Sequence, residues 1–79
     1  MDKNFDYLIA SDTEHEEVFI EIYCNKKYVA SINQELGIDN LQIEFPGTGL
    51  EESLIERKIP LTQFLDLVNQ AAKILTDKA

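Results

Sequence analysis

The stretch Val18-Phe19-Ile20-Glu21-Ile22-Tyr23-Cys24 decides the fold, because its side chains alternate strictly in character. The even positions form one apolar face, made of Val18, Ile20, Ile22 and Cys24. The odd positions form a mixed face, made of Phe19, Glu21 and Tyr23. Alternation with β-branched and aromatic residues is typical of a strand. We therefore predict a β-strand over this stretch.

The residues that follow predict two more strands in the same sheet. The polar residues 25–27 fit a hairpin loop, and residues 28–33 resume the alternation. Two strands joined this tightly pair antiparallel. A turn around Gly37 precedes a third alternating run over residues 40–45, which Pro46-Gly47-Thr48-Gly49 ends.

Two further segments leave more than one interpretation or a weaker pattern. Residues 54–60 alternate less regularly and carry charged side chains, which favours an edge strand. Phe5, Tyr7 and Ile9 alternate with more varied neighbours, which permits an extra strand, but residues 7–10 fit one helical turn equally well. Residues 11–17 are expected to form a solvated connection under either assignment.

The C-terminal segment predicts an amphipathic helix that begins at Pro60. Proline suits the first turn of a helix, because its φ angle is fixed and no N–H is required there. Apolar residues then recur at helical spacing: Leu61, Phe64, Leu65, Val68, Ala71, Ala72 and Leu75. We expect this stripe to cover the sheet, with Phe64 and Val68 over its centre.

Together these elements predict one α+β domain over residues 1–79, with a three- to four-stranded antiparallel sheet packed by one C-terminal helix. Residues 1–16 form an undecided N-terminal segment, residues 17–59 the sheet and residues 60–76 the helix. At 79 residues, with 44% hydrophobic and 28% charged side chains, the chain is long enough for one small core. The single Cys24 lies in the apolar strand pattern and is expected to fill that core.

Acidic residues are concentrated in two windows. Residues 1–21 hold seven acids against Lys3 alone, which supplies −6 of the net charge of −8. Residues 35–56 hold further acids and neither Lys nor Arg. Such a field favours a positively charged partner and disfavours nucleic acid and anionic lipid surfaces. The start of the chain has no apolar signal region, and no stretch approaches membrane-spanning length, so we expect a cytoplasmic protein.

The chain offers little chemistry for catalysis or for cofactors. His15 lies among acids, but no second histidine accompanies it, so we expect no metal site. Pro46-Gly47-Thr48-Gly49 lacks the Lys-Ser/Thr of a phosphate loop and precedes Glu51 and Glu52, so a strand-ending turn is the better interpretation. We expect no catalytic residues, no cofactor and no enzyme activity.

The order of the predicted elements resembles that of small immunity proteins from bacterial contact-dependent growth inhibition and related polymorphic toxin systems. The segments that carry the likeness are residues 18–23, 28–32, 41–45 and 59–65, within a span of about residues 17–76. The resemblance implies a cytosolic protein that binds the toxin domain of a cognate effector and blocks it. Many such toxins are nucleases, including ribonucleases.

The leading hypothesis is therefore a stoichiometric inhibitor, monomeric when free, that neutralises a cognate toxin with a basic surface. The predicted partner-binding residues are the acids of the two windows and two aromatic residues: Asp12, Glu14, Glu16, Glu17, Glu21, Asp39, Glu44, Glu51, Glu52, Phe19 and Tyr23. Phe19 and Tyr23 would supply an aromatic centre if their face is uncovered. The alternative is a small acidic interaction or oligomerisation module that pairs through its sheet edge or through these two aromatic residues. Under a third interpretation both acidic windows serve solubility alone.

Overall fold

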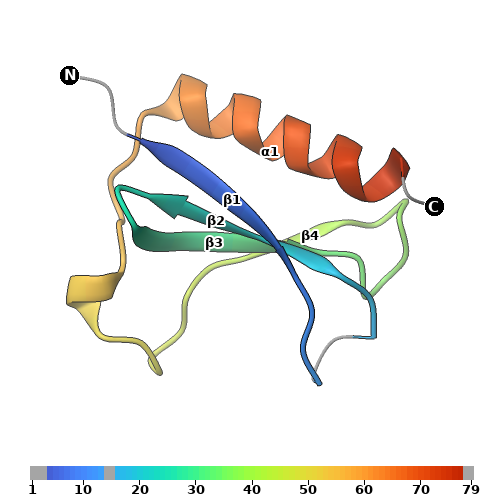
Figure 1. Cartoon of the computed structure of the whole chain (residues 1–79), viewed down its shortest axis with the longest axis horizontal. Coiled ribbons are helices and arrows are strands. Elements are labelled where there is room, and N and C mark those ends of the chain that lie inside the picture. The colour runs from blue at the N-terminus through green and yellow to red at the C-terminus, as the bar shows by residue number, and fades with distance from the viewer. Residues whose placement is uncertain (1–3, 14–15, 78–79) are drawn as a thin grey trace.

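A computed structural model describes residues 4–13 and 16–77 of the chain. Its elements follow the order β1 (Phe5–Ala10), β2 (Phe19–Cys24), β3 (Lys27–Asn33), β4 (Gln42–Glu44), the 3-10 helix η1 (Glu52–Leu54) and α1 (Leu61–Asp77). The four strands form one antiparallel sheet in the order β1-β2-β3-β4. In Figure 1, α1 lies along one side of this sheet, and β1 crosses in front of the other strands. The predicted α+β arrangement with one C-terminal helix is confirmed.

The N-terminal segment, for which the sequence permitted two structures, is the edge strand β1. It pairs with β2 without interruption from Phe5 opposite Cys24 to Ala10 opposite Phe19. Asn4 and Asn25 join the start of β1 to the β2–β3 turn: the amide of Asn25 donates to the carbonyl of Asn4 at 2.7 Å. The backbone pairing with β2 decides between strand and helical turn, and it joins residues that are far apart in sequence.

The β2–β3 connection is tighter than the predicted three-residue loop. Asn25 and Lys26 have φ angles of 52° and 68°, and β3 already begins at Lys27. Two central residues with positive φ are the signature of the hairpin turn whose twist matches that of the strands. Lys26 therefore occupies a left-handed backbone conformation that glycine would adopt without steric cost. A register shift between Ile22 and Tyr23 adds a bulge just before the turn.

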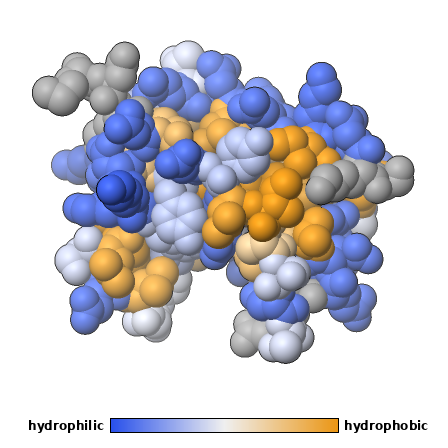
Figure 2. All heavy atoms as spheres, viewed as in Figure 1, coloured by the Kyte–Doolittle hydropathy of each residue, from blue (hydrophilic) through white to orange (hydrophobic). Residues whose placement is uncertain are grey.

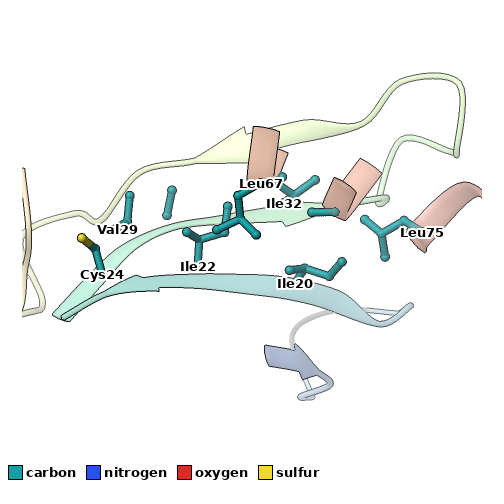
Figure 3. Packing of buried hydrophobic residues seen from close by; sticks show 9 residues of the cluster. Ile20, Ile22, Cys24, Val29, Ile32, Leu67 and Leu75 are labelled. Carbon is teal, nitrogen blue, oxygen red and sulfur yellow. The ribbon is translucent and has the colours of Figure 1, made fainter. Parts of the chain in front are cut away.

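The core lies between the sheet and α1. Its buried members are Ile20, Ile22, Cys24, Val29, Ala30, Ile32, Leu67, Ala71 and Leu75. Figure 3 shows the strand residues Ile20, Ile22 and Ile32 in the same layer as Leu67 and Leu75 of α1. Cys24 is fully buried and fills the core as predicted. The alternation of residues 18–24 thus identified the core-facing side of β2 correctly.

The predicted apolar stripe of the helix was partly wrong. Leu61 and Leu65 are 69% and 49% exposed, whereas Leu67, which the stripe omitted, is buried. Phe64 and Val68 pack beside the centre of the core rather than over it, since the buried helix residues are Leu67, Ala71 and Leu75. The apolar arc of this helix is wider than the sheet covers, so sequence spacing alone does not show which part of the arc faces the sheet.

The predicted edge strand over residues 54–60 is also wrong. The chain instead forms η1 and touches β3 at a single parallel bridge between Tyr28 and Ile55. The amide of Glu56 donates to the carbonyl of Tyr28 at 2.9 Å, and Ile55 is buried. The bridge at Ile55 holds this segment against β3, and Ile59 packs against the core without continuing the strand pairing.

The predicted third strand is confirmed as the shorter β4. Ile43 lies opposite Ile32 on the side of α1, and Leu41 packs against the core. Phe45, which the alternation placed on the same face, lies beyond the strand end and is 65% exposed. Within the described residues, α1 is too short or too polar to cross a membrane.

Candidate functional site

Among the residues that the structure describes, α1 packs on one face of the sheet only. Residues opposite one another in antiparallel strands share a face. The pairs Glu21–Ser31 and Tyr23–Tyr28 alternate with the core-facing pairs Ile20–Ile32 and Ile22–Ala30, so they lie on the face away from α1. We call this the open face, and its side chains include those of Glu21, Tyr23, Tyr28 and, from β4, Glu44.

A hollow of about 540 Å³ lies between the open face and the loop that follows β4. The sheet contributes carboxylates and aromatic rings to it, and the loop contributes apolar side chains. Its lining consists of Glu21, Tyr23, Lys26, Tyr28, Glu44, Phe45, Pro46, Gly47, Leu50 and Leu54. Figure 2 shows apolar surface over η1 and the loop before it, at the lower left. The hollow thus joins an acidic, aromatic floor to an apolar rim.

The floor of the hollow is built around a pair of tyrosines. The rings of Tyr23 and Tyr28 pack edge to face, with centroids 5.7 Å apart and planes at 65°. The Tyr23 hydroxyl donates a hydrogen bond to Oε1 of Glu21 at 3.3 Å. Such an arrangement presents an aromatic face beside a carboxylate, and both attract a cation.

The pKa values of the two tyrosines reflect both their burial and the nearby carboxylates. Burial raises the pKa of the Tyr23 hydroxyl, and the charge of Glu21 and its hydrogen bond raise it further. Burial also raises the pKa of Tyr28; a hydrogen bond with Ser31 opposes that effect, while the charges of Glu21 and Glu44 add to it. Both hydroxyls therefore stay neutral at physiological pH. The carboxylates that disfavour tyrosinate would favour a positive group at the same place.

Glu44 is positioned from within the sheet. Its Oε1 accepts a hydrogen bond at 2.6 Å from Nδ2 of Asn33, a side chain that is only 1% exposed. Oδ1 of Asn33 in turn accepts from the amide of Glu35 at 3.3 Å. A buried amide held on both sides fixes the carboxylate at the wall of the hollow.

Lys26 is the basic residue of the hollow's lining. It occupies the tip of the β2–β3 turn, where its φ is positive, and its side chain is exposed. Its charge partly offsets the field of Glu21 and Glu44. A cationic ligand would therefore compete with Lys26 for the carboxylates.

The structure brings together three of the predicted contact residues and separates the others. Glu21, Tyr23 and Glu44 line the hollow. Phe19 is only 6% exposed and is not an accessible aromatic anchor. The carboxylate of Glu52 is engaged by Arg57, with an Nη2–Oε1 distance of 2.6 Å, and this pairing lowers the pKa of Glu52.

The acids of the first window lie elsewhere. Glu16 and Glu17 border a second hollow of about 590 Å³, near the end of α1 at Leu75, together with Gln34 and Glu35. The backbone amide of Glu16 donates to Oε1 of Glu35 at 3.2 Å. Three other predicted contacts are exposed outside both hollows: Asp12, Asp39 and Glu51. Glu14 lies outside the described residues.

Sequence reasoning missed the loop side of the hollow and one of its two tyrosines. Tyr28 faces Tyr23 because the bulge in the hairpin shifts the register, and only the paired strands show that. Phe45, Leu50 and Leu54 carry the apolar rim, with exposures of 65%, 44% and 54%. An aromatic residue directly before Pro46, followed by two leucines in a turn-rich stretch, was the available signal.

The hollow presents carboxylates, phenol hydroxyls and one ammonium group, which can bind a charged or hydrogen-bonding ligand. Cys24, the one thiol of the chain, is fully buried on the other face. In the part of the chain that the structure describes, no three His, Cys, Asp or Glu side chains gather where they would hold a metal ion. The hollow is an open, acidic and aromatic depression with an exposed apolar rim. Comparison of the chain with protein-family models, curated proteins and solved structures gave no match.

Proposed function

We propose that this chain is an immunity protein, which binds a cognate toxin domain with a basic surface in the cytoplasm and neutralises it as a stoichiometric complex. The observation that carries this proposal is the hollow on the open face, in which Glu21 and Glu44 flank the Tyr23–Tyr28 pair. A basic side chain of the partner enters this hollow and is held by both kinds of group.

Arginine is the side chain that this hollow accommodates best. A guanidinium group stacks on aromatic rings and donates in-plane hydrogen bonds from its N–H groups to carboxylates, whereas an ammonium group is a compact point charge. Tyr23 and Tyr28 offer the rings, and Glu21 offers a carboxylate beside them. An arginine in a desolvated aromatic pocket is typical of the residues that dominate protein–protein binding energy.

The rim of the hollow supports a protein as the partner. Phe45, Leu50 and Leu54 are exposed around the charged floor. A partner surface that covers them excludes water from the ion pairs beneath, which strengthens those pairs. The net charge of −8 also speeds encounter with a basic protein and opposes nucleic acid.

The resemblance to immunity proteins of polymorphic toxin systems supports a toxin as that partner. It rests on small size, acidity and the order of strands and helix. A nuclease has a basic substrate groove, so a nuclease toxin, including a ribonuclease, fits the acidic floor. The inhibitor acts by forming a stoichiometric complex, without turnover.

The experiment tests the product of a gene adjacent to that of this chain as the candidate toxin, provided that this product is toxic when it is expressed alone. Cells that express that toxin domain are rescued by the wild-type chain if the proposal holds. Glu21→Lys places a cation in the hollow and is expected to abolish rescue. Asp66→Lys makes the same charge change on an exposed position of α1 and is the matched control, which is expected to rescue fully.

The same pair of variants is measured by calorimetry with the purified toxin domain. We expect a one-to-one complex that Glu21→Lys weakens at least about 100-fold, as for a central contact of an interface. Equal rescue and equal affinity for Glu21→Lys and Asp66→Lys would refute the open face as the binding site. Failure of the wild-type chain to rescue or bind would refute the immunity function itself.

A different observation favours the second candidate, an oligomerisation module without a toxin partner. This observation is the exposed edge strand β1, which pairs with β2 on one side.

A further inference from the structure

The two edges of the sheet are protected to different degrees. β4 is three residues long, and Pro46 follows two residues after it. β1 is six residues long, pairs with β2 in an unbroken register and, within residues 4–13 and 16–77, has no strand on its outer side. Natural sheets blunt their edges with short strands, prolines, bulges or charged side chains, because an open edge pairs with other chains. β4 has such protection and β1 has little.

The side chains of β1 are apolar on both faces of the strand. Tyr7 and Ile9 lie on the side of α1 and are 41% and 40% exposed, and Leu8 lies on the open face and is 53% exposed. Asp6 is the single charged residue of the strand. A long, apolar edge of this kind is a pairing surface rather than a solvated one.

The apolar character of this edge continues onto the helix. Figure 2, seen with β1 in front, shows an apolar area that extends over β1 and α1 on this side of the molecule. The open edge of β1 therefore borders further apolar surface.

We propose that the outer edge of β1 binds the β1 strand of a second copy of this chain, antiparallel, so that two four-stranded sheets form one continuous sheet. The pairing is isologous, with a two-fold axis perpendicular to the sheet. The backbone groups on the outer side of β1 then find partners, which is the main source of affinity when a strand is added to a sheet edge.

The sequence of β1 matches itself in this arrangement. Pairing about such an axis places odd positions opposite odd and even opposite even, so that each face of the sheet continues into the other copy. With Leu8 on the axis, Tyr7 lies opposite Ile9 of the second copy. Asp6 lies opposite Ala10 of the second copy and not opposite another Asp6, which avoids a direct repulsion.

Charge and size set the strength of this contact. Each copy carries a net charge of −8, so the two copies repel each other at low salt. A pairing of two six-residue strands with their flanking side chains falls at the small end of specific interfaces. The dimer is therefore weak, dependent on concentration and favoured by salt. At low concentration the chain is a monomer, as the sequence analysis expects, and the dimer forms only at high concentration.

This inference does not rest on the proposed function. Pairing in the plane of the sheet leaves the open face uncovered, so a dimer retains both hollows for a basic partner. The two contacts also respond to salt in opposite directions. Screening weakens the contact with a cationic partner and strengthens the contact between two acidic copies.

The test is sedimentation equilibrium of the full chain over a wide range of concentration, at about 0.05 M and about 0.5 M NaCl. The wild-type chain is expected to pass from monomer to dimer, with the lower dissociation constant at the higher salt. A chain that stays monomeric at millimolar concentration in both salts would overturn the proposal. So would a dimer that salt weakens.

A matched pair of lysine variants locates the contact. Ile9 of β1 and Ile43 of β4 lie in one row across the helix-covered side of the sheet, through Ile20 and Ile32, and are 40% and 38% exposed. Ile9→Lys is expected to raise the dimer dissociation constant about tenfold or more, because two cross-strand pairs are lost per dimer. Ile43→Lys makes the same change in charge and hydrophobicity at the other edge and is expected to leave it unchanged.

Hydrogen exchange on the wild-type chain gives a second measurement that needs no variant. Amides of β1 are expected to gain protection as the protein concentration rises, while those of β4 do not. Protection gained in β4 or η1 but not in β1 would overturn the proposal. A dimer that survives Ile9→Lys would do the same.

Discussion

The two faces of this sheet are built by the same strands, yet they serve different ends. Ile20 and Ile22 of β2 are fully buried against α1, whereas Glu21 and Tyr23, one position away, line an open hollow. The period of two in a β-strand separates the two sets completely. One face therefore packs against α1, and the other leaves Glu21 and Tyr23 accessible, although Phe19 and Asn33 on that face are buried. Substitutions on the two faces should separate in the same way.

The largest difference between the faces is expected from Ile22→Ala. Ile22 is fully buried at the centre of the core, and removing it leaves a cavity under α1. Such truncations cost about 2 to 5 kcal/mol of the free energy of unfolding, and a domain of this size has a total of only a few kcal/mol. Urea denaturation followed by circular dichroism should find this variant largely unfolded. The neighbouring Glu21→Gln is expected to change the free energy of unfolding by less than about 0.5 kcal/mol.

A smaller effect is expected where the open face carries a buried polar contact between Asn33 and Glu44. Glu44→Ala removes the acceptor of Asn33 Nδ2, and Asn33 is 1% exposed. The loss should be about 1 kcal/mol, since a buried donor is left without its protein partner. Glu44→Gln keeps an acceptor oxygen and should retain most of the stability. Equal losses in the two variants, measured by urea denaturation, would show that the contact matters through charge alone.

Lys26→Gly should act on both stability and binding. Lys26 has a φ of 68°, which glycine adopts without a clash, so the free energy of unfolding should rise by about 0.5 kcal/mol. The change also removes the cation from the lining of the hollow, so binding of a cationic ligand should strengthen. Lys27→Gly at the first residue of β3 is the control and should destabilise, because glycine weakens a strand.

The smallest expected effect is on the pH dependence of stability. Burial and Glu21 raise the pKa of Tyr23 in the folded chain, so folding holds the phenol proton more tightly than the unfolded chain does. This contribution is fully present below about pH 10 and is lost as the pH rises through the folded pKa. Ultraviolet titration should show that Glu21→Gln lowers the pKa of Tyr23, while Asp66→Asn does not. Identical titration curves for all three proteins would show that Glu21 has no influence at the ring.

The elements that the sequence predicted correctly are those with local, repeated signals. Residues 18–24 alternate without a break, and Pro60 marks the helix start, so β2 and α1 were found where expected. β1 was undecided because its assignment depends on pairing with β2, and the paired residues are far apart in the sequence. The strand over residues 54–60 failed because a single buried residue, Ile55, is too little to fix a strand.

The candidate site was less predictable than the fold. Charge patterning selected Glu21 and Glu44, which line the hollow, but could not separate them from Glu52, which Arg57 engages. The alternation put Phe19 and Tyr23 on one face, yet Phe19 is buried and Tyr28 takes its place as the aromatic neighbour of Tyr23. The Tyr23–Tyr28 pair depends on the register of the β2–β3 hairpin. The apolar rim depends on the loop after β4, which folds back against the sheet.

The measurement that tests the central claim most directly is an NMR titration of the chain with N-acetyl-arginine amide. N-acetyl-norleucine amide serves as an uncharged control for the probe, and Glu21→Gln and Asp66→Asn serve as matched variants. We expect the ring signals of Tyr23 and Tyr28 to shift with arginine and not with norleucine, and the affinity to fall in Glu21→Gln alone. Shifts spread evenly over the exposed acids, or an unchanged affinity in Glu21→Gln, would contradict the assignment of the open face as a receptor for a basic side chain.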